Sequence, residues 1–85
     1  MQLDIITPVE ELYSNKIVLV QLPGADGLFE IMKNHAPIIS SLVQGKIKVT
    51  DINKQTHFFH ITGGIVECKS DKVIVLANEG AAINE

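Results

Sequence analysis

Three histidines are the side chains of this 85-residue chain that could bind a metal ion or carry protons near neutral pH. His57 and His60 differ by an odd number, which puts them on opposite faces of a regular β-strand. His35 stands apart from both, and no acidic or cysteine side chain lies at ligand spacing from any of the three. Because zinc sites need three or four protein ligands, we expect no metal site here.

The other reactive side chains also lack the neighbours that catalysis requires. Cys68 is the only cysteine, so an internal disulfide is excluded, and nothing beside it in sequence would activate its thiol. Ser40 and Ser41 belong to no nucleophile motif. The glycine pair Gly24 and Gly27 lacks the helix, lysine and hydroxyl of a phosphate-binding loop, and it predicts a turn between strands. We expect neither a catalytic residue nor a cofactor.

The charged residues exclude further classes of function. The net charge is −3, and all seven basic residues are lysines. Nucleic-acid binding is disfavoured, because it needs clustered basic side chains to replace phosphate counterions. Without arginine, bidentate phosphate clamps are not available. The sequence shows no basic leader and no apolar run long enough to span a membrane, so we expect a cytoplasmic protein.

Short apolar runs bounded by Gly, Pro, Asn, Asp or Ser predict an all-β fold, since almost no stretch keeps a helical period. The turns are expected at 53–55 and 70–71. We predict an antiparallel β-sandwich in one domain over 1–77, followed by a short tail over 78–85. The expected strands are 3–7, 16–22, 28–32, 46–52, 56–62, 65–69 and 72–77.

Two of these strands are apolar on both faces, at 17–20 and at 73–76. One face of an antiparallel sheet is usually polar, so either loops and long side chains cover the second face or a partner protein does. The apolar content of 46% in so short a chain favours a partner. Alternation within the strands predicts core positions at Ile5, Ile17, Leu19, Ile47, Val49, Phe58, Ile65, Val73 and Val75.

Four segments in order resemble the epsilon subunit of bacterial F-type ATP synthases. Residues 3–8 (LDIITP) are similar to the opening strand of that family, and residues 23–37 (PGADGLFEIMKNHAP) to its signature loop. Residues 63–67 (GGIVE) and 73–77 (VIVLA) resemble two later motifs. The signature loop departs from the family pattern at Glu30 and at 32–33.

The resemblance implies a sandwich of about ten short strands and a non-catalytic role. Such a subunit joins the gamma subunit to the ring of c subunits in the central stalk, so that proton or sodium flow drives rotation and ATP synthesis. The implied location is peripheral, on the cytoplasmic face of the bacterial inner membrane. The implied partner-binding residues are Asp26 and Leu28 on the c-ring side and His35 on the gamma side, with Pro37 in the same loop.

The family's longer members carry a helical arm after the sandwich, and in some of them this arm binds ATP. Residues 77–85 resemble only the seam before that arm, so we expect neither ATP binding nor inhibition by an arm. An alternative is a lipoyl or biotinyl carrier domain with Lys72 modified, because residues 67–73 (ECKSDKV) resemble a lipoyl-lysine turn. That alternative leaves the segment 23–37 unexplained.

Overall fold

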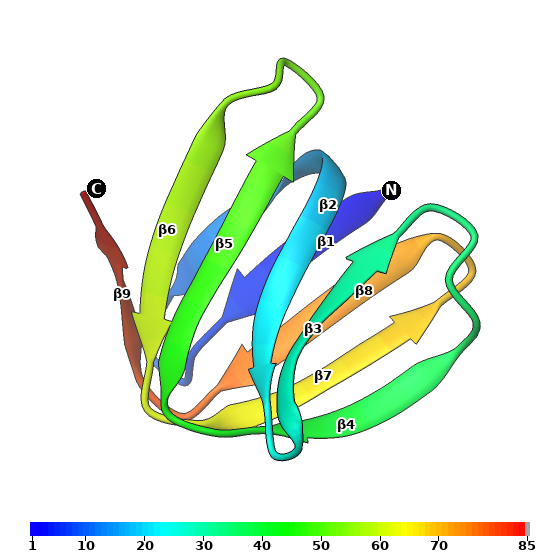
Figure 1. Ribbon diagram of the computed structural model, residues 1–85. Coiled ribbons are helices and arrows are strands. Elements are labelled where there is room, and N and C mark those ends of the chain that lie inside the picture. The colour runs from blue at the N-terminus through cyan, green and yellow to red at the C-terminus, as the bar shows by residue number, and fades with distance from the viewer. Residues whose placement is uncertain (85) are drawn as a thin grey trace.

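A computed structural model describes residues 1–84, and these residues form nine strands. None of them belongs to a helix that is long and apolar enough to cross a membrane. The strands (Figure 1) are β1 (Gln2–Ile6), β2 (Glu11–Gly24), β3 (Gly27–Met32), β4 (Ile38–Leu42), β5 (Gly45–Asp51), β6 (Thr56–Ile61), β7 (Gly64–Lys69), β8 (Lys72–Ala77) and β9 (Gly80–Ile83). The predicted all-β sandwich is confirmed.

The strands form two layers that β2 connects (Figure 1). The first layer, here called the first sheet, has the order β1, β8, β7, β4, with β1 and β8 parallel. The second sheet has the order β3, β2, β5, β6, β9. The first part of β2 pairs with β1, and its second part pairs with β3 and β5 after a register shift between Ile17 and Leu19. This bend lets a single strand serve both sheets.

The core lies between the two sheets and is almost entirely aliphatic. Six of the nine predicted core residues are buried: Ile5, Ile17, Ile47, Val49, Val73 and Val75. The whole buried apolar set adds Leu3, Val20, Leu22, Ile31, Leu42, Phe59, Ile61, Val66, Cys68 and Ala77.

Three core predictions were wrong, because each chose the wrong one of two adjacent apolar residues. The register shift in β2 turns Val20 inward and leaves Leu19 half-buried. Side chains alternate between faces, so the inward positions of Phe59 and Val66 place Phe58 and Ile65 on the outer faces.

Two strands were not predicted. β4 contains two serines, and β9 is made of small residues with little preference for strands. Residues 80–83 pair with β6, while the proposed division into 1–77 and 78–85 stays a prediction. The two predicted turns are confirmed, and Ser70 and Asp71 both have the positive φ of a tight hairpin turn.

Candidate partner-binding surfaces

The outer face of the first sheet presents a row of exposed aliphatic side chains. The register aligns Ile6 of β1 with Leu76 of β8, and Leu76 with Ile65 of β7. Leu76 and Ile65 are 50% and 41% exposed, and Ile39 on β4 is 67% exposed. The row continues on β4 with Ser41, and Ile39 lies two residues along β4, beside Glu67. We call this largely apolar outer surface of the four strands the apolar face. A sheet face of this kind is typical of a protein contact.

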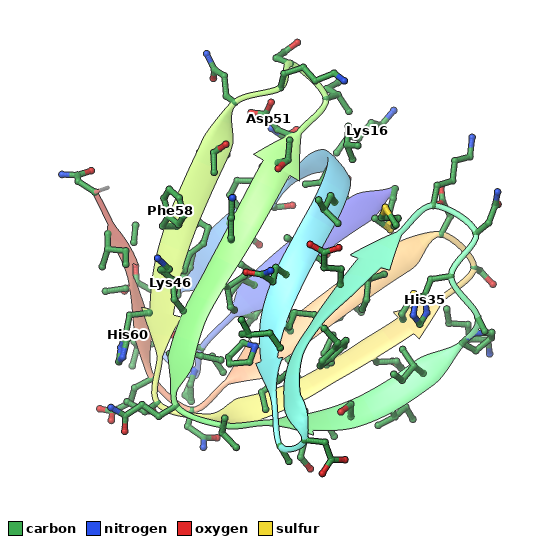
Figure 2. All side chains as sticks on the ribbon, viewed as in Figure 1. Lys16, His35, Lys46, Asp51, Phe58 and His60 are labelled. Atoms are coloured by element: carbon green, nitrogen blue, oxygen red, sulfur yellow. The ribbon has the colours of Figure 1, made fainter. Side chains whose placement is uncertain are left out.

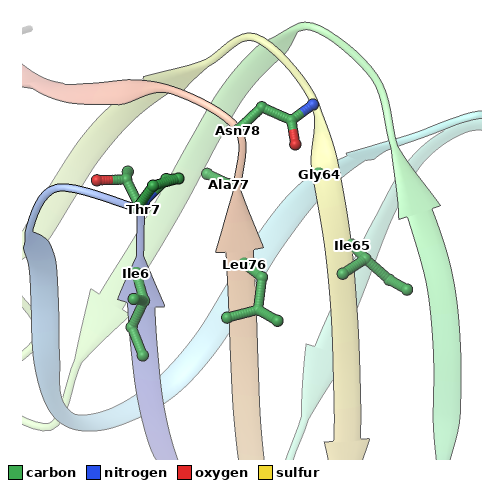
Figure 3. Close-up of a pocket in the computed structure, with 8 residues that line it drawn as sticks. Ile6, Thr7, Gly64, Ile65, Leu76, Ala77 and Asn78 are labelled. Atoms are coloured by element: carbon green, nitrogen blue, oxygen red, sulfur yellow. The ribbon is translucent and has the colours of Figure 1, made fainter.

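A hollow of about 540 Å³ lies at one end of the apolar face (Figure 3). Ile6, Ile65 and Leu76 form its apolar side, and Thr7 and Asn78 bring polar groups to its end. Gly64 belongs to the same wall, and a Cβ atom there would lie 2.3 Å from the carbonyl oxygen of Leu76. The close approach of β7 and β8 at this point therefore requires glycine.

Charges enter the apolar face only in its next rows. Asp4, Ile74, Glu67 and Ile39 are aligned across the four strands. The carboxylate of Asp4 accepts hydrogen bonds from Ser14 Oγ at 2.7 Å and Gln2 Nε2 at 3.0 Å, and these bonds lower the pKa of this carboxyl. The face thus changes from uncharged and mostly apolar beside the hollow to mixed further along the strands.

The signature loop is divided by β3 into two separate sites. Asp26 belongs to the turn between β2 and β3, and Leu28, 66% exposed, follows it. His35 and Pro37 lie in the connection from β3 to β4. At about 3.3 Å per residue, the six residues of β3 hold these two pairs roughly 20 Å apart. The structure therefore does not bring the four predicted residues together.

The first pair lies at the same end of the sandwich as the hollow. The backbone pairs Gly24 with Leu42, and Leu42 with Gly64, so the β2–β3 turn and the hollow's wall are connected. The turns at this end carry three carboxylates and no lysine: Glu10, Asp26 and Glu79. This end, which we call the acidic end, thus combines negative charge with exposed apolar side chains.

The second pair lies at the opposite end. The ring Nδ1 of His35 donates a hydrogen bond to the Ala36 carbonyl at 2.7 Å, and the side chain is exposed (Figure 2). Pro37 lies against Ile39 and Glu67, at the border of the apolar face. Pro37 therefore belongs to the same surface as Ile65 and Leu76, whereas His35 lies beyond its edge.

Comparison with known proteins identifies the family of this chain. The family model for the ATP synthase delta/epsilon chain, β-sandwich domain, matches residues 1–82. The chain belongs to this family. The ATP synthase epsilon chain of Chlorobium limicola is 40% identical over 78 residues, and the match covers 92% of this chain and 89% of that one. The epsilon chain of Paramagnetospirillum magneticum is 32% identical over 85 residues, which are 100% of this chain and 64% of that one.

Two solved structures of mitochondrial ATP synthases contain a chain that shares the fold. A chain of the mitochondrial ATP synthase of Euglena gracilis superposes with a TM-score of 0.88 at 16% identity, over 94% of this chain and 51% of that one. A chain of the Tetrahymena thermophila enzyme gives a TM-score of 0.78 at 16% identity, over 94% and 64%. The predicted resemblance is confirmed, and the carrier-domain alternative with Lys72 modified finds no support. Lys72 instead lies 4.0 Å from Asp4 at the start of β8.

His57 and Cys68 of this delta/epsilon sandwich have local contacts that give them a structural role. His57 Nε2 donates to Oδ2 of Asp51 at 2.8 Å, and this bond is the main cause of the lowered pKa of Asp51. Burial raises the pKa of the Cys68 thiol and so disfavours its reactive form. Among residues 1–84 no group of three or more His, Cys, Asp or Glu side chains could hold a metal ion.

The residues of the apolar face were not predicted as a site. The available signal was the stretch 73–76, which is apolar on both faces, but Ile65 was predicted to lie in the core and β4 was not predicted. The contribution of Ile39 was visible only once β4 was placed beside β7.

Proposed function

We propose that this chain is a non-catalytic subunit of the rotor of an F-type ATP synthase, in which it joins the gamma subunit to the ring of c subunits. It would rotate with both partners and help transmit the torque of ion flow to the catalytic head. As a peripheral part of a membrane-associated complex, it would lie on the cytoplasmic face of the bacterial inner membrane.

The apolar face is the observation that supports this role most directly. Leu76, Ile65 and Ile39 leave apolar area in water that a monomeric domain of this size would ordinarily cover. Burying such area stabilises a complex by about 25 cal/mol per Å² before the costs of association. We assign this face, including Pro37 at its border, to the gamma subunit.

The acidic end is assigned to the c-ring. Asp26 and Leu28 project from the β2–β3 turn, a tight connection on a rigid pair of strands. A surface that combines a carboxylate with an apolar side chain suits polar loops of a partner better than a lipid surface, where the negative charge would be repelled. His35, at the other end, is assigned to a peripheral contact with gamma.

The experiment is co-purification from solubilised membranes with the chain carrying an affinity tag. The proposal predicts recovery of gamma together with the catalytic alpha and beta subunits. The variant Leu76→Ser should lose most of this recovery. The matched control is Ile52→Ser, because Ile52 is similarly exposed, at 54%, but lies in the turn between β5 and β6, away from the apolar face. Equal recovery with both variants would refute the assignment of this face.

A further inference from the structure

The outer face of the second sheet has a different chemistry. The register aligns Lys48 with Phe58, and Phe58 with Ile83 of β9. Two residues further along the strands, Lys46 is aligned with His60, and His60 with Ala81. A mixed row (Lys, Phe, Ile) therefore runs beside a basic row (Lys, His, Ala).

The ring of Phe58 holds the ammonium group of Lys46 in place. Lys46 Nζ lies 5.0 Å from the centre of the Phe58 ring, and Figure 2 shows Lys46, Phe58 and His60 close together on β5 and β6. Lys48 and His60 form no ion pair with any of residues 1–84. In a chain of net charge −3, this is a local basic surface suited to carboxylates.

The neighbouring strand β9 offers an unprotected edge. It pairs with β6 on one side only, and it lies at the margin of the sandwich (Figure 1). Edge strands are usually protected by lysine, proline or a bulge, but Gly80–Ile83 contains no charged residue and no proline. Its unpaired amide and carbonyl groups can therefore add a further strand from another chain.

These two features fit one kind of ligand, and we propose that β9 binds an extended segment of a partner protein in which acidic and apolar residues alternate. Strands lie about 4.8 Å apart, so an added strand would be roughly 10 Å from β6. A glutamate of that segment beside Ala81 can reach His60, because alanine leaves the space between them open.

The other row receives the apolar side chain. It would stand beside Ile83 and Phe58, both half-buried, next to a hollow of about 270 Å³ that Ala82 also lines. Since outward side chains in a strand are two residues apart, the segment should carry an acidic and an apolar residue separated by one residue: the acidic one first if it runs parallel to β9, and the apolar one first if it runs antiparallel. A nucleic acid is the less suitable ligand, because the site lacks arginine and the whole chain is acidic.

The test is site-specific photo-crosslinking in cells, with a photoreactive residue replacing Ala81 in the full chain. The expected product is a crosslink to one protein segment that has a carboxylate within two residues of the attachment point. The substitution His60→Ala should lower the crosslink yield by roughly two- to fivefold, as expected for the loss of one exposed polar contact. Lys54→Ala, in the distant β5–β6 turn, is the matched control and should leave the yield unchanged.

A second measurement uses the chain without the photoreactive residue, so that any structural effect of that residue is avoided. Hydrogen exchange of the unsubstituted chain in the assembled enzyme should show amides of Ala81–Ile83 protected at least tenfold relative to the isolated chain. Absence of both crosslink and protection would overturn the proposal. So would crosslinks to a basic segment or to nucleic acid, or a yield insensitive to His60→Ala. The proposal does not depend on the gamma assignment, because β9 and the apolar face belong to different sheets.

Discussion

The two outer faces of the sandwich differ although the strands beneath them obey the same alternation. On the first sheet the outward positions beside the hollow are Ile6, Ile65 and Leu76. On the second sheet Lys46 and His60 are aligned on the outer face of β5 and β6, and His60 lies beside β9. The inward residues of both sheets are almost entirely aliphatic. The core therefore specifies the fold, and the outward residues specify which partner each face can bind.

The largest expected effect concerns Gly64, where β7 approaches β8 beneath the apolar face. Gly64→Val should destabilise the domain by about 3 kcal/mol or more, because Cβ would collide with a backbone carbonyl and φ is +155°. Urea unfolding measures the loss. Gly27→Val is the control: φ there is +121°, but no atom lies within 4 Å of the added Cβ, so the loss should be clearly smaller. Equal losses would show that the close approach is unimportant.

Replacing aliphatic residues of the apolar face should weaken binding to gamma while the domain stays folded. The double variant Ile65→Ser and Leu76→Ser should bind gamma at least tenfold more weakly, which is about 1.4 kcal/mol of lost burial. Titration calorimetry with purified gamma gives the affinity, and circular dichroism checks that the sandwich remains folded. Lys48→Ser on the opposite face should bind gamma as the unaltered chain does. If the Lys48 variant is the weaker binder, the faces have been assigned the wrong way round.

Low pH should destabilise the β5–β6 turn of the second sheet, because Asp51 becomes protonated. Its oxygens accept hydrogen bonds from His57 and from the amides of Gln55 and Asn53, and these bonds hold its pKa in the folded state below the ordinary value of an aspartate. A depressed pKa contributes stability that is complete above the unfolded pKa and is lost as pH falls through the folded value. Asp51→Asn should therefore flatten the fall in Tm below about pH 4.

Asp4→Asn provides the comparison on the first sheet, where Ser14 and Gln2 lower the pKa of Asp4 in the same direction. Asp4 holds no turn, so its substitution should lower Tm at neutral pH less than Asp51→Asn does. A Tm that falls equally in both variants would mean that the β5–β6 turn does not depend on Asp51.

The smallest effect is expected at His35. This exposed side chain makes a local hydrogen bond to Ala36 and packs little, so His35→Ala should leave Tm within about 1 °C. Affinity for gamma should fall by about threefold, as for a contact at the rim of an interface. Surface plasmon resonance with immobilised gamma resolves a change of this size. An unaltered affinity would remove His35 from the interface, whereas a large drop in Tm would make it a structural residue.

The sequence predicted the fold because period-two alternation and turn residues are local signals. It could not choose between Phe58 and Phe59, or between Ile65 and Val66, because adjacent apolar residues satisfy both registers. The bend of β2 is equally invisible, since it depends on pairing with both β1 and β5. The four residues taken from the signature loop lie within the short stretch 26–37 of the sequence but belong to opposite ends of β3. The apolar face could not be predicted from the sequence, because β1, β8, β7 and β4 become neighbours only in the folded chain.

The assignment of the apolar face as the site that binds gamma is tested most directly by amide chemical shifts of the isotopically labelled chain. Addition of unlabelled gamma should shift or broaden the amides of Ile39, Ile65, Ile74 and Leu76, and leave those of Lys48, Phe58 and His60 nearly unchanged. Changes concentrated on β5 and β6, with β7 and β8 unaffected, would contradict the assignment of the apolar face to gamma.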